Sequence, residues 1–272
     1  MDAQGTWERK GAQRPVGIFD SGVGGLSVAR EIRQTLGAED LVYVADTAYC
    51  PYGDRAVEEV RRRALAVGRY LEASGARLVI VACNTASGAA LEDLRAVLSV
   101  PVVGLEPALK TAVARTRTRR VGVMATSGTL RSERFSRLLR AHADGTEVVA
   151  QACPGLADLI EEGHLDDEPL AARLGELTAP LLEAGVDMVV IGCTHYAFVA
   201  PALERALGPG VTLVDSAPAI ARRAAHILDE AGVRRLEGSG SLRVLTTGRP
   251  EKVAPIVERL WGEPVAVDAV LI

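Results

Sequence analysis

Residues 78–85 read LVIVACNT, and 110 positions later residues 188–195 read MVVIGCTH. Each stretch carries an unbroken apolar run into a small residue, a cysteine and a polar pair. Continuous apolar runs of this kind are typical of parallel strands that are buried on both faces of a sheet. Open parallel sheets bind their ligands at the carboxyl ends of the strands. We therefore expect two similar half-molecules, each presenting one cysteine, Cys83 or Cys193, just beyond a strand.

The rest of the chain alternates short apolar runs with amphipathic stretches. Strands are expected at residues 16–19, 41–45, 78–82, 102–103, 121–124, 148–150, 188–191, 213–214, 244–246 and 265–267. Helices are expected at residues 26–36, 56–74, 89–98, 132–142, 156–162, 169–184, 198–207, 218–230 and 250–261. The alternation of strand and helix, strict as far as residue 103, predicts an α/β fold built from mostly parallel sheets flanked by helices.

Composition excludes several classes of function. The chain has 272 residues and a net charge of −4, so it lacks the overall basic charge that nucleic-acid binding normally requires. The arginines at 61–63 are expected to lie on a solvated helix surface. No apolar run reaches the length of a membrane span, and the polar residues 1–14 are expected to form a flexible extension. The four cysteines form no CxxC pair, which favours reduced thiols in the cytoplasm.

Cys83 and Cys193 are the candidate reactive groups. A free cysteine is usually a small buried apolar residue, and this interpretation suits Cys50 and Cys153. Cys83 and Cys193 instead occupy equivalent strand ends and precede hydrogen-bonding side chains. Two equivalent groups that face each other can invert a carbon centre, because one removes a proton from one face and the other returns a proton to the opposite face. The reference pKa of a thiol, about 8.5, allows either form near neutral pH.

Polar residues at other strand ends can complete a ligand site. The loop DSGVGG at 20–25 follows the first strand, and its backbone N–H groups could hold a carboxylate or a phosphate. This loop matches neither a P-loop nor a dinucleotide-binding fingerprint. Residues 46–53, DTAYCPYG, leave a neighbouring strand and are either a plain turn or a ligand loop. His195 could donate to a carboxylate or assist the Cys193 thiol.

Cofactor routes are disfavoured by the sequence. Only Lys10, Lys110 and Lys252 occur, and none follows a recognisable cofactor loop, whereas a pyridoxal phosphate enzyme needs a Schiff-base lysine and a phosphate cup. No closely spaced His and Cys ligand set indicates a metal site. We therefore expect neither a cofactor nor a metal.

Four motifs taken together resemble the cofactor-independent amino-acid racemase superfamily, and within it the glutamate racemases. The motifs are GIFDSGVGGL at 17–26, CPYG at 50–53, ACNTAS at 82–87 and GCTHY at 192–196. The resemblance covers about residues 15–268. It implies two α/β domains with the active site between them: residues 15–107 with 217–272 form the first, and residues 108–216 form the second.

The resemblance also implies roles for individual residues. Cys83 would exchange the α-proton of D-glutamate and Cys193 that of L-glutamate, and the product D-glutamate would supply peptidoglycan. The residues expected to assist the thiols are Asp20, Asp46, Glu161 and His195, with Glu162 as an alternative to Glu161. The residues expected to bind the amino acid are Asp20, Ser21, Tyr52, Gly53, Asn84, Thr85, Thr194 and His195. A homodimer is the expected assembly.

Some positions depart from the family pattern. Ala45 replaces a common glycine, Tyr49 a common arginine, and 197–198 a common Pro-Leu pair. These changes touch the walls of the expected pocket and leave the thiols in place. Three alternatives remain open at this point: an aspartate or related racemase with the same thiol pair, a thiol-dependent hydrolase or decarboxylase, and a protein-binding role without catalysis.

Overall fold

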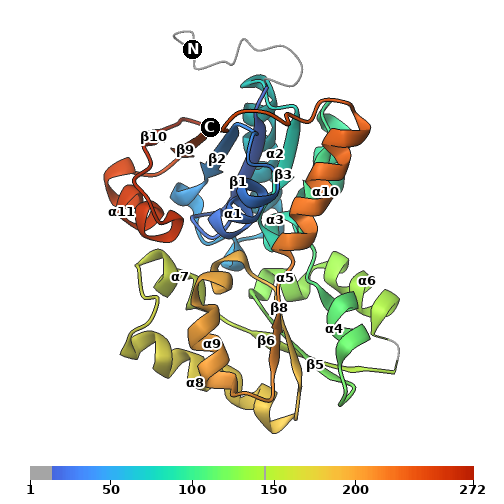
Figure 1. Cartoon of the computed structure of the whole chain (residues 1–272). Helices are drawn as coiled ribbons and strands as arrows, with labels where there is room; N and C mark the ends of the chain where they lie inside the picture. The colour runs from blue at the N-terminus through green and yellow to red at the C-terminus, as the bar shows by residue number, and fades with distance from the viewer. Residues whose placement is uncertain (1–13, 144) are drawn as a thin grey trace.

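The chain folds into two parallel sheets with helices on both faces of each. The computed structural model describes residues 14–143 and 145–272, so residues 1–13 of the predicted extension lie outside the described part. One sheet has six strands in the order β10-β9-β2-β1-β3-β4, and the other has four in the order β6-β5-β7-β8. Figure 1 shows two stacked units, with the C-terminal segment returning to the unit that holds the first strands. The predicted α/β class is confirmed.

The strands are β1 (Val16–Asp20), β2 (Leu41–Ala45), β3 (Leu78–Val81), β4 (Val102–Gly104), β5 (Arg120–Ala125), β6 (Glu147–Ala152), β7 (Met188–Ile191), β8 (Thr212–Val214), β9 (Leu242–Thr246) and β10 (Val267–Ala269). The α-helices are α1 (Leu26–Thr35), α2 (Val57–Ala73), α3 (Asn84–Val97), α4 (Leu109–Arg115), α5 (Ser127–Arg131), α6 (Glu133–His142), α7 (Leu156–Glu161), α8 (Glu168–Glu183), α9 (Ala200–Leu207), α10 (Ala217–Glu230) and α11 (Pro250–Trp261). Short 3-10 segments are η2 (Thr47–Tyr49), η3 (Tyr52–Asp54) and η4 (Thr194–Val199).

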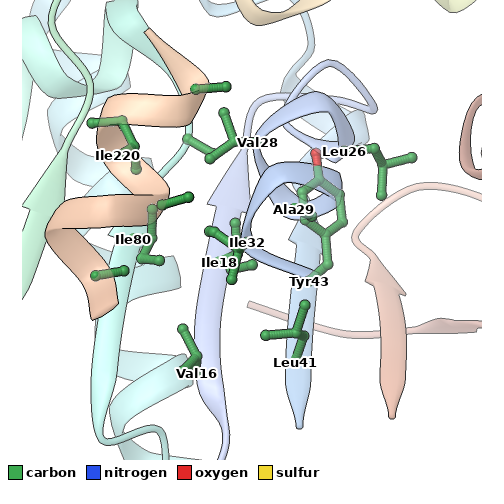
Figure 2. Packing of buried hydrophobic residues seen from close by; sticks show 14 of the residues in the cluster. Val16, Ile18, Leu26, Val28, Ala29, Ile32, Leu41, Tyr43, Ile80 and Ile220 are labelled. Carbon is green, nitrogen blue, oxygen red and sulfur yellow. The ribbon is translucent and has the colours of Figure 1, made fainter. Parts of the chain in front are cut away.

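The six-stranded sheet is buried on both faces, which explains its continuous apolar strands. Alternate residues of a strand point to opposite faces, so each strand contributes to two separate cores. Val16 and Ile18 of β1 pack with α1, α10 and α11. Figure 2 shows this core, in which Ile18, Tyr43 and Ile80 of three adjacent strands meet side chains of α1 and α10. Phe19 packs on the other face, against α2 and α3.

The four-stranded sheet repeats the arrangement. Val189 and Ile191 of β7 pack against α7, α8 and α9, whereas Val190 of the same strand packs against α4 and α6. The chain passes between the two units twice, between β4 and α4 and between β8 and α10. The Ser216 hydroxyl donates to the Glu106 carbonyl at 2.8 Å, which ties the two passages together.

The register of the paired strands determines which of the candidate site residues leave a sheet at the same edge. Asp20 lies beside Ala45 in the β1–β2 pair, and Phe19 lies beside Val81 in the β1–β3 pair. Asp46 and Cys83 therefore leave the sheet at the same edge as Asp20. In the other sheet Met124 lies beside Ile191, so residues 126 and 193 leave at a common edge as well.

The structure differs from the sequence-based prediction at several element ends. Helix α3 begins at Asn84 rather than at 89, because Cys83 serves as its N-cap and its sulfur accepts the Ala86 N–H at 3.4 Å. Strand β10 begins two residues later than expected. Helices α4 and α5, of seven and five residues, lie outside the predicted helices, since one or two turns give only a weak periodic signal; the six-residue α7 was nevertheless predicted.

Candidate active site

The carboxyl ends of β1, β3, β5 and β7 converge on one cavity between the two sheets. Its volume is about 10 Å³, the space of roughly one water molecule. Cys83 comes from the edge of the six-stranded sheet and Cys193 from the edge of the four-stranded sheet, and both line it. The other lining residues are Asp20, Ser21, Pro51, Tyr52, Gly53, Asn84, Thr85, Thr126, Ala157, Gly192, Thr194 and His195.

Cys83 is held as a neutral thiol by its surroundings. Its side chain is buried at the N-terminus of α3. Burial raises the pKa of the Cys83 thiol well above its ordinary value, and the nearby Asp20 carboxylate raises it further. The hydrogen bond from the Ala86 N–H acts in the opposite direction and is outweighed. These surroundings favour the protonated form of the Cys83 thiol.

Cys193 has a different neighbourhood, which is dominated by a histidine and a carboxylate. Its sulfur lies 3.6 Å from Nδ1 of His195, and Nε2 of the same ring lies 2.7 Å from Oε1 of Glu161. Burial lowers the pKa of His195, but contacts with Cys193, Cys50 and Glu161 outweigh it and raise this pKa well above its ordinary value. Burial raises the pKa of Glu161, and its hydrogen bond with His195 reverses the effect so that this pKa is lowered. The His195 ring therefore stands as a cation between the Glu161 carboxylate and the Cys193 sulfur.

In the glycine-rich loop at 20–25, a backbone N–H group that could bind an anionic ligand binds a carboxylate side chain of the protein instead. The Val23 N–H donates to Oε1 of Glu161 at 2.7 Å. The glycines make room for this arrangement: a Cβ on Gly22 would stand 1.8 Å from Oε1 of Glu161, and a Cβ on Gly24 would stand 2.4 Å from Nδ1 of His195. The loop therefore seats Glu161 and His195 against the carboxyl end of β1.

Asp20 joins the two halves of the site. It is fully buried, and burial raises its pKa despite the opposing charge of His195. One carboxylate oxygen accepts the Ser21 hydroxyl at 2.9 Å, and the other accepts the Thr194 hydroxyl at 2.7 Å. Ser21 and Thr194 belong to different sheets, so this carboxylate fixes their relative position.

A threonine cluster closes the opposite side of the cavity. The Thr85 hydroxyl lies 2.9 Å from the Thr126 hydroxyl and 3.2 Å from the Thr129 hydroxyl. Beside it, the Asn84 carbonyl oxygen Oδ1 is buried and has no hydrogen-bond partner. Sequence reasoning missed Thr126. The signal was present, because Thr126 directly follows β5, just as the cysteines follow β3 and β7.

Asp46 does not line the cavity, but it binds Tyr52, which does. The Tyr52 hydroxyl donates a short hydrogen bond to Asp46, and Arg63 binds the same carboxylate through two nitrogens, at 3.0 and 2.8 Å. Arg63 also donates to the carbonyl of the last residue, Ile272, at 2.7 Å. The expectation that residues 61–63 are all solvated is wrong for Arg63, whose residue is only 6 % exposed.

The two remaining cysteines occupy different places. Cys50 is partly buried, and its sulfur lies 3.5 Å from Oε1 of Glu161, so a third thiol borders the site. Burial raises the pKa of Cys50 to about 12. Cys153 is buried in the core beneath the four-stranded sheet and does not line the cavity. All four cysteines are free thiols.

Fold and site together define an α/β enzyme whose small cavity lies between two parallel sheets, with one thiol contributed by each sheet. The family model described as Asp/Glu/Hydantoin racemase matches residues 16–224. The chain belongs to this family and is an isomerase.

Individual relatives match over nearly their whole length. A glutamate racemase of Roseiflexus sp. is 47 % identical over 250 residues, which cover 91 % of this chain and 92 % of that protein. A glutamate racemase of Pseudomonas aeruginosa is 43 % identical, with coverage of 94 % and 97 %. The solved structure of a glutamate racemase isoform from Bacillus anthracis has a TM-score of 0.89 at 33 % identity, and covers 96 % of this chain and 98 % of its own. None of the helices in the described part of the chain is long and apolar enough to cross a bilayer.

Proposed function

We propose that this protein interconverts L-glutamate and D-glutamate by a two-base proton transfer between the substrate Cα and the thiols of Cys83 and Cys193. One observation carries the proposal. Each thiol stands at the equivalent strand end of a different sheet, and both line a single cavity. The glutamate racemases of Roseiflexus and Pseudomonas, similar along nearly their whole length, support glutamate as the substrate.

With L-glutamate the two thiols take opposite roles. Cys193 faces the His195 cation and serves as the base, whereas the protonated Cys83 serves as the acid. The Cys193 thiolate removes the α-proton, and its S–H bond forms as the Cα–H bond breaks. Cys83 then delivers its proton to the opposite face of the carbanion and becomes the thiolate. D-Glutamate reacts by the same steps in reverse.

His195 and Glu161 are positioning residues for Cys193 in this scheme. With Nε2–H held by Glu161, the Nδ1 atom can receive the thiol proton or return it, so the ring keeps the thiol able to change state. Asp20 holds Ser21 and Thr194 in place, and Asp46 holds Tyr52.

The substrate would be held by polar groups of the cavity wall. The orphaned Oδ1 of Asn84 is an acceptor and suits the substrate ammonium group. The Thr85 hydroxyl and the backbone near Gly53 suit the carboxylates, and the Ser21 and Thr194 hydroxyls can donate to them only by turning away from Asp20. A positive ammonium group inside the cavity also lowers the pKa of nearby thiols. A cavity with room for one water must open to admit an amino acid, and its closure leaves fixed donors in place of solvent around the carbanion.

Racemisation in heavy water tests the reaction. With either enantiomer of glutamate and no added cofactor, deuterium should enter the product enantiomer before it enters the remaining substrate, because a different thiol protonates each face. Equal early labelling of both enantiomers would indicate a single base, and absence of exchange would refute racemisation. Aspartate, tested in parallel, should react far more slowly.

Single substitutions test the two thiols. Cys83→Ser and Cys193→Ser should each abolish racemisation, because a serine hydroxyl is far less acidic than a thiol. Cys153→Ser, which changes a buried thiol outside the cavity, is the matched control and should retain activity. Full activity in either of the first two variants would contradict the assignment.

The remaining expectations also belong to this proposal. Residues 15–107 with 217–272, and residues 108–216, would be the two domains. The protein would be a homodimer in the cytoplasm, where four free thiols stay reduced. Its D-glutamate would supply peptidoglycan. Light scattering would test the assembly, and rescue of a depleted strain by D-glutamate would test the role.

A further inference from the structure

The side chains of Cys50, Glu161 and His195 lie together beside the cavity and offer three possible metal ligands. The proton-transfer scheme does not require these three side chains to act together. The ligand atoms of Cys50, Glu161 and His195 all lie within 4.8 Å of one another. The residues come from three segments far apart in the chain, so their spacing in the sequence gave no sign of a metal site. A thiolate, an imidazole nitrogen and a carboxylate oxygen are the three ligand types that bind zinc in proteins.

The distance between Cys50 and Glu161 fits a tetrahedral ion. Zinc bond lengths of about 2.3 Å to sulfur and about 2.0 Å to oxygen place the two ligand atoms about 3.5 Å apart at a tetrahedral angle. Cys50 Sγ and Glu161 Oε1 are 3.5 Å apart. His195 Nε2 and Glu161 Oε1 are 2.7 Å apart, where a tetrahedral zinc site requires about 3.3 Å, so a small side-chain shift completes the set.

The cluster is reachable from solvent and held from behind. The Glu161 side chain is 20 % exposed and Cys50 is partly buried, whereas the His195 side chain is only 3 % exposed. The loop at 20–25 presses against the cluster, since a Cβ on Gly22 would stand 2.7 Å from Cys50 Sγ as well as 1.8 Å from Glu161 Oε1.

We propose that Cys50, Glu161 and His195 form an inhibitory binding site for a thiophilic divalent cation such as Zn²⁺. The ion forms one bond each to Cys50 Sγ, Glu161 Oε1 and His195 Nε2. The Cys50 thiol proton and the proton on Nε2 pass to solvent as these bonds form. No oxidant or reductant takes part.

Inhibition follows from the position of Glu161 and His195 beside Cys193. An ion bonded to both Nε2 and Oε1 replaces the 2.7 Å hydrogen bond by which Glu161 holds the His195 ring. The ring then no longer keeps Nδ1 in its place 3.6 Å from Cys193 Sγ, so it loses its positioning role for that thiol. Both directions of racemisation should slow equally, because the equilibrium constant is unchanged. Only this inhibitory consequence rests on the proposed racemase function; metal binding by the three ligands does not.

Cobalt substitution tests the site directly. The reduced, chelator-treated full-length protein is titrated with Co²⁺, and one equivalent should produce an intense sulfur-to-cobalt charge-transfer band that Zn²⁺ displaces. Cys50→Ser should lose this band and weaken Zn²⁺ binding in equilibrium dialysis about tenfold or more. Cys153→Ser is the matched control and should retain both.

The outcomes separate this proposal from the racemase proposal. Absence of the cobalt charge-transfer band in the wild-type protein would overturn the proposed metal site. Persistence of the band in Cys50→Ser would overturn it as well, because the ion would then be bound by other thiols. Cys50→Ala, checked by circular dichroism, replaces the serine variant if that variant does not fold. Loss of racemase activity with an intact band would count against the racemase proposal alone. Zinc inhibition that is as strong in Cys50→Ser as in the wild type would refute the regulatory role.

Discussion

Replacing Arg63 with methionine should destabilise the protein by about 3–5 kcal/mol, because the substitution leaves the buried Asp46 carboxylate without its cation. The side chains of Arg63 and Asp46 are 7 % and 0 % exposed, and two nitrogens bind the two carboxylate oxygens. Methionine preserves much of the aliphatic stem and removes the charge. The hydrogen bond to the Ile272 carbonyl is lost as well.

Urea unfolding and thermal unfolding, both followed by circular dichroism, measure this loss. For a chain of this size about 2 °C of melting temperature corresponds to 1 kcal/mol, so we expect a decrease of about 6–10 °C. Arg62→Met is the matched control on the same helix, since Arg62 is exposed, and it should change stability by less than about 0.5 kcal/mol.

Activity provides a second measure of the same substitution. Asp46 holds the Tyr52 hydroxyl, and Tyr52 lines the cavity, so kcat/KM should fall at temperatures where Arg63→Met remains folded. Equal stability of the Arg63 and Arg62 variants would refute the role of the buried ion pair. Normal kcat/KM in a folded but destabilised Arg63 variant would limit that role to stability.

Three further predictions concern the site. Gly24→Ala should abolish racemisation, because its Cβ would stand 2.4 Å from the His195 ring. Gly175→Ala is the control: nothing crowds its Cβ within 4 Å, so it should retain activity and gain up to about 1 kcal/mol of helix stability. An active Gly24→Ala variant would contradict the close packing of this loop on His195. Between about pH 6.5 and 8 the wild-type free energy of unfolding should fall as pH rises, because the raised pKa keeps His195 protonated in the folded state after the unfolded ring has lost its proton. His195→Gln should flatten that slope in urea titrations at each pH, and an unchanged slope would count against the assignment. Thr126→Val, which removes the 2.9 Å hydrogen bond to Thr85, should raise KM by roughly fivefold, the equivalent of about 1 kcal/mol; an unaltered KM would exclude Thr126 from substrate binding.

The sequence by itself determined the strands and the edge at which chemistry occurs. Apolar runs and the positions that follow them are local features, so the repeat at 78–85 and 188–195 is enough to locate Cys83 and Cys193 at equivalent strand ends. The parallel register then places Asp20, Asp46 and Cys83 at one edge, because each directly ends or follows a strand of the same sheet.

Only the tertiary structure decided which groups meet across the two sheets. Glu161 lies at the end of α7, yet it binds the Val23 N–H, His195 and Cys50, which belong to segments far from it in the chain. No local pattern encodes such contacts, because they depend on how the units pack. The same packing buries Arg63 against Asp46 while Arg62 remains exposed, although both stand in one run of arginines. The sequence therefore identified the two thiols, and the fold supplied the charges and hydrogen bonds that give each thiol a different environment.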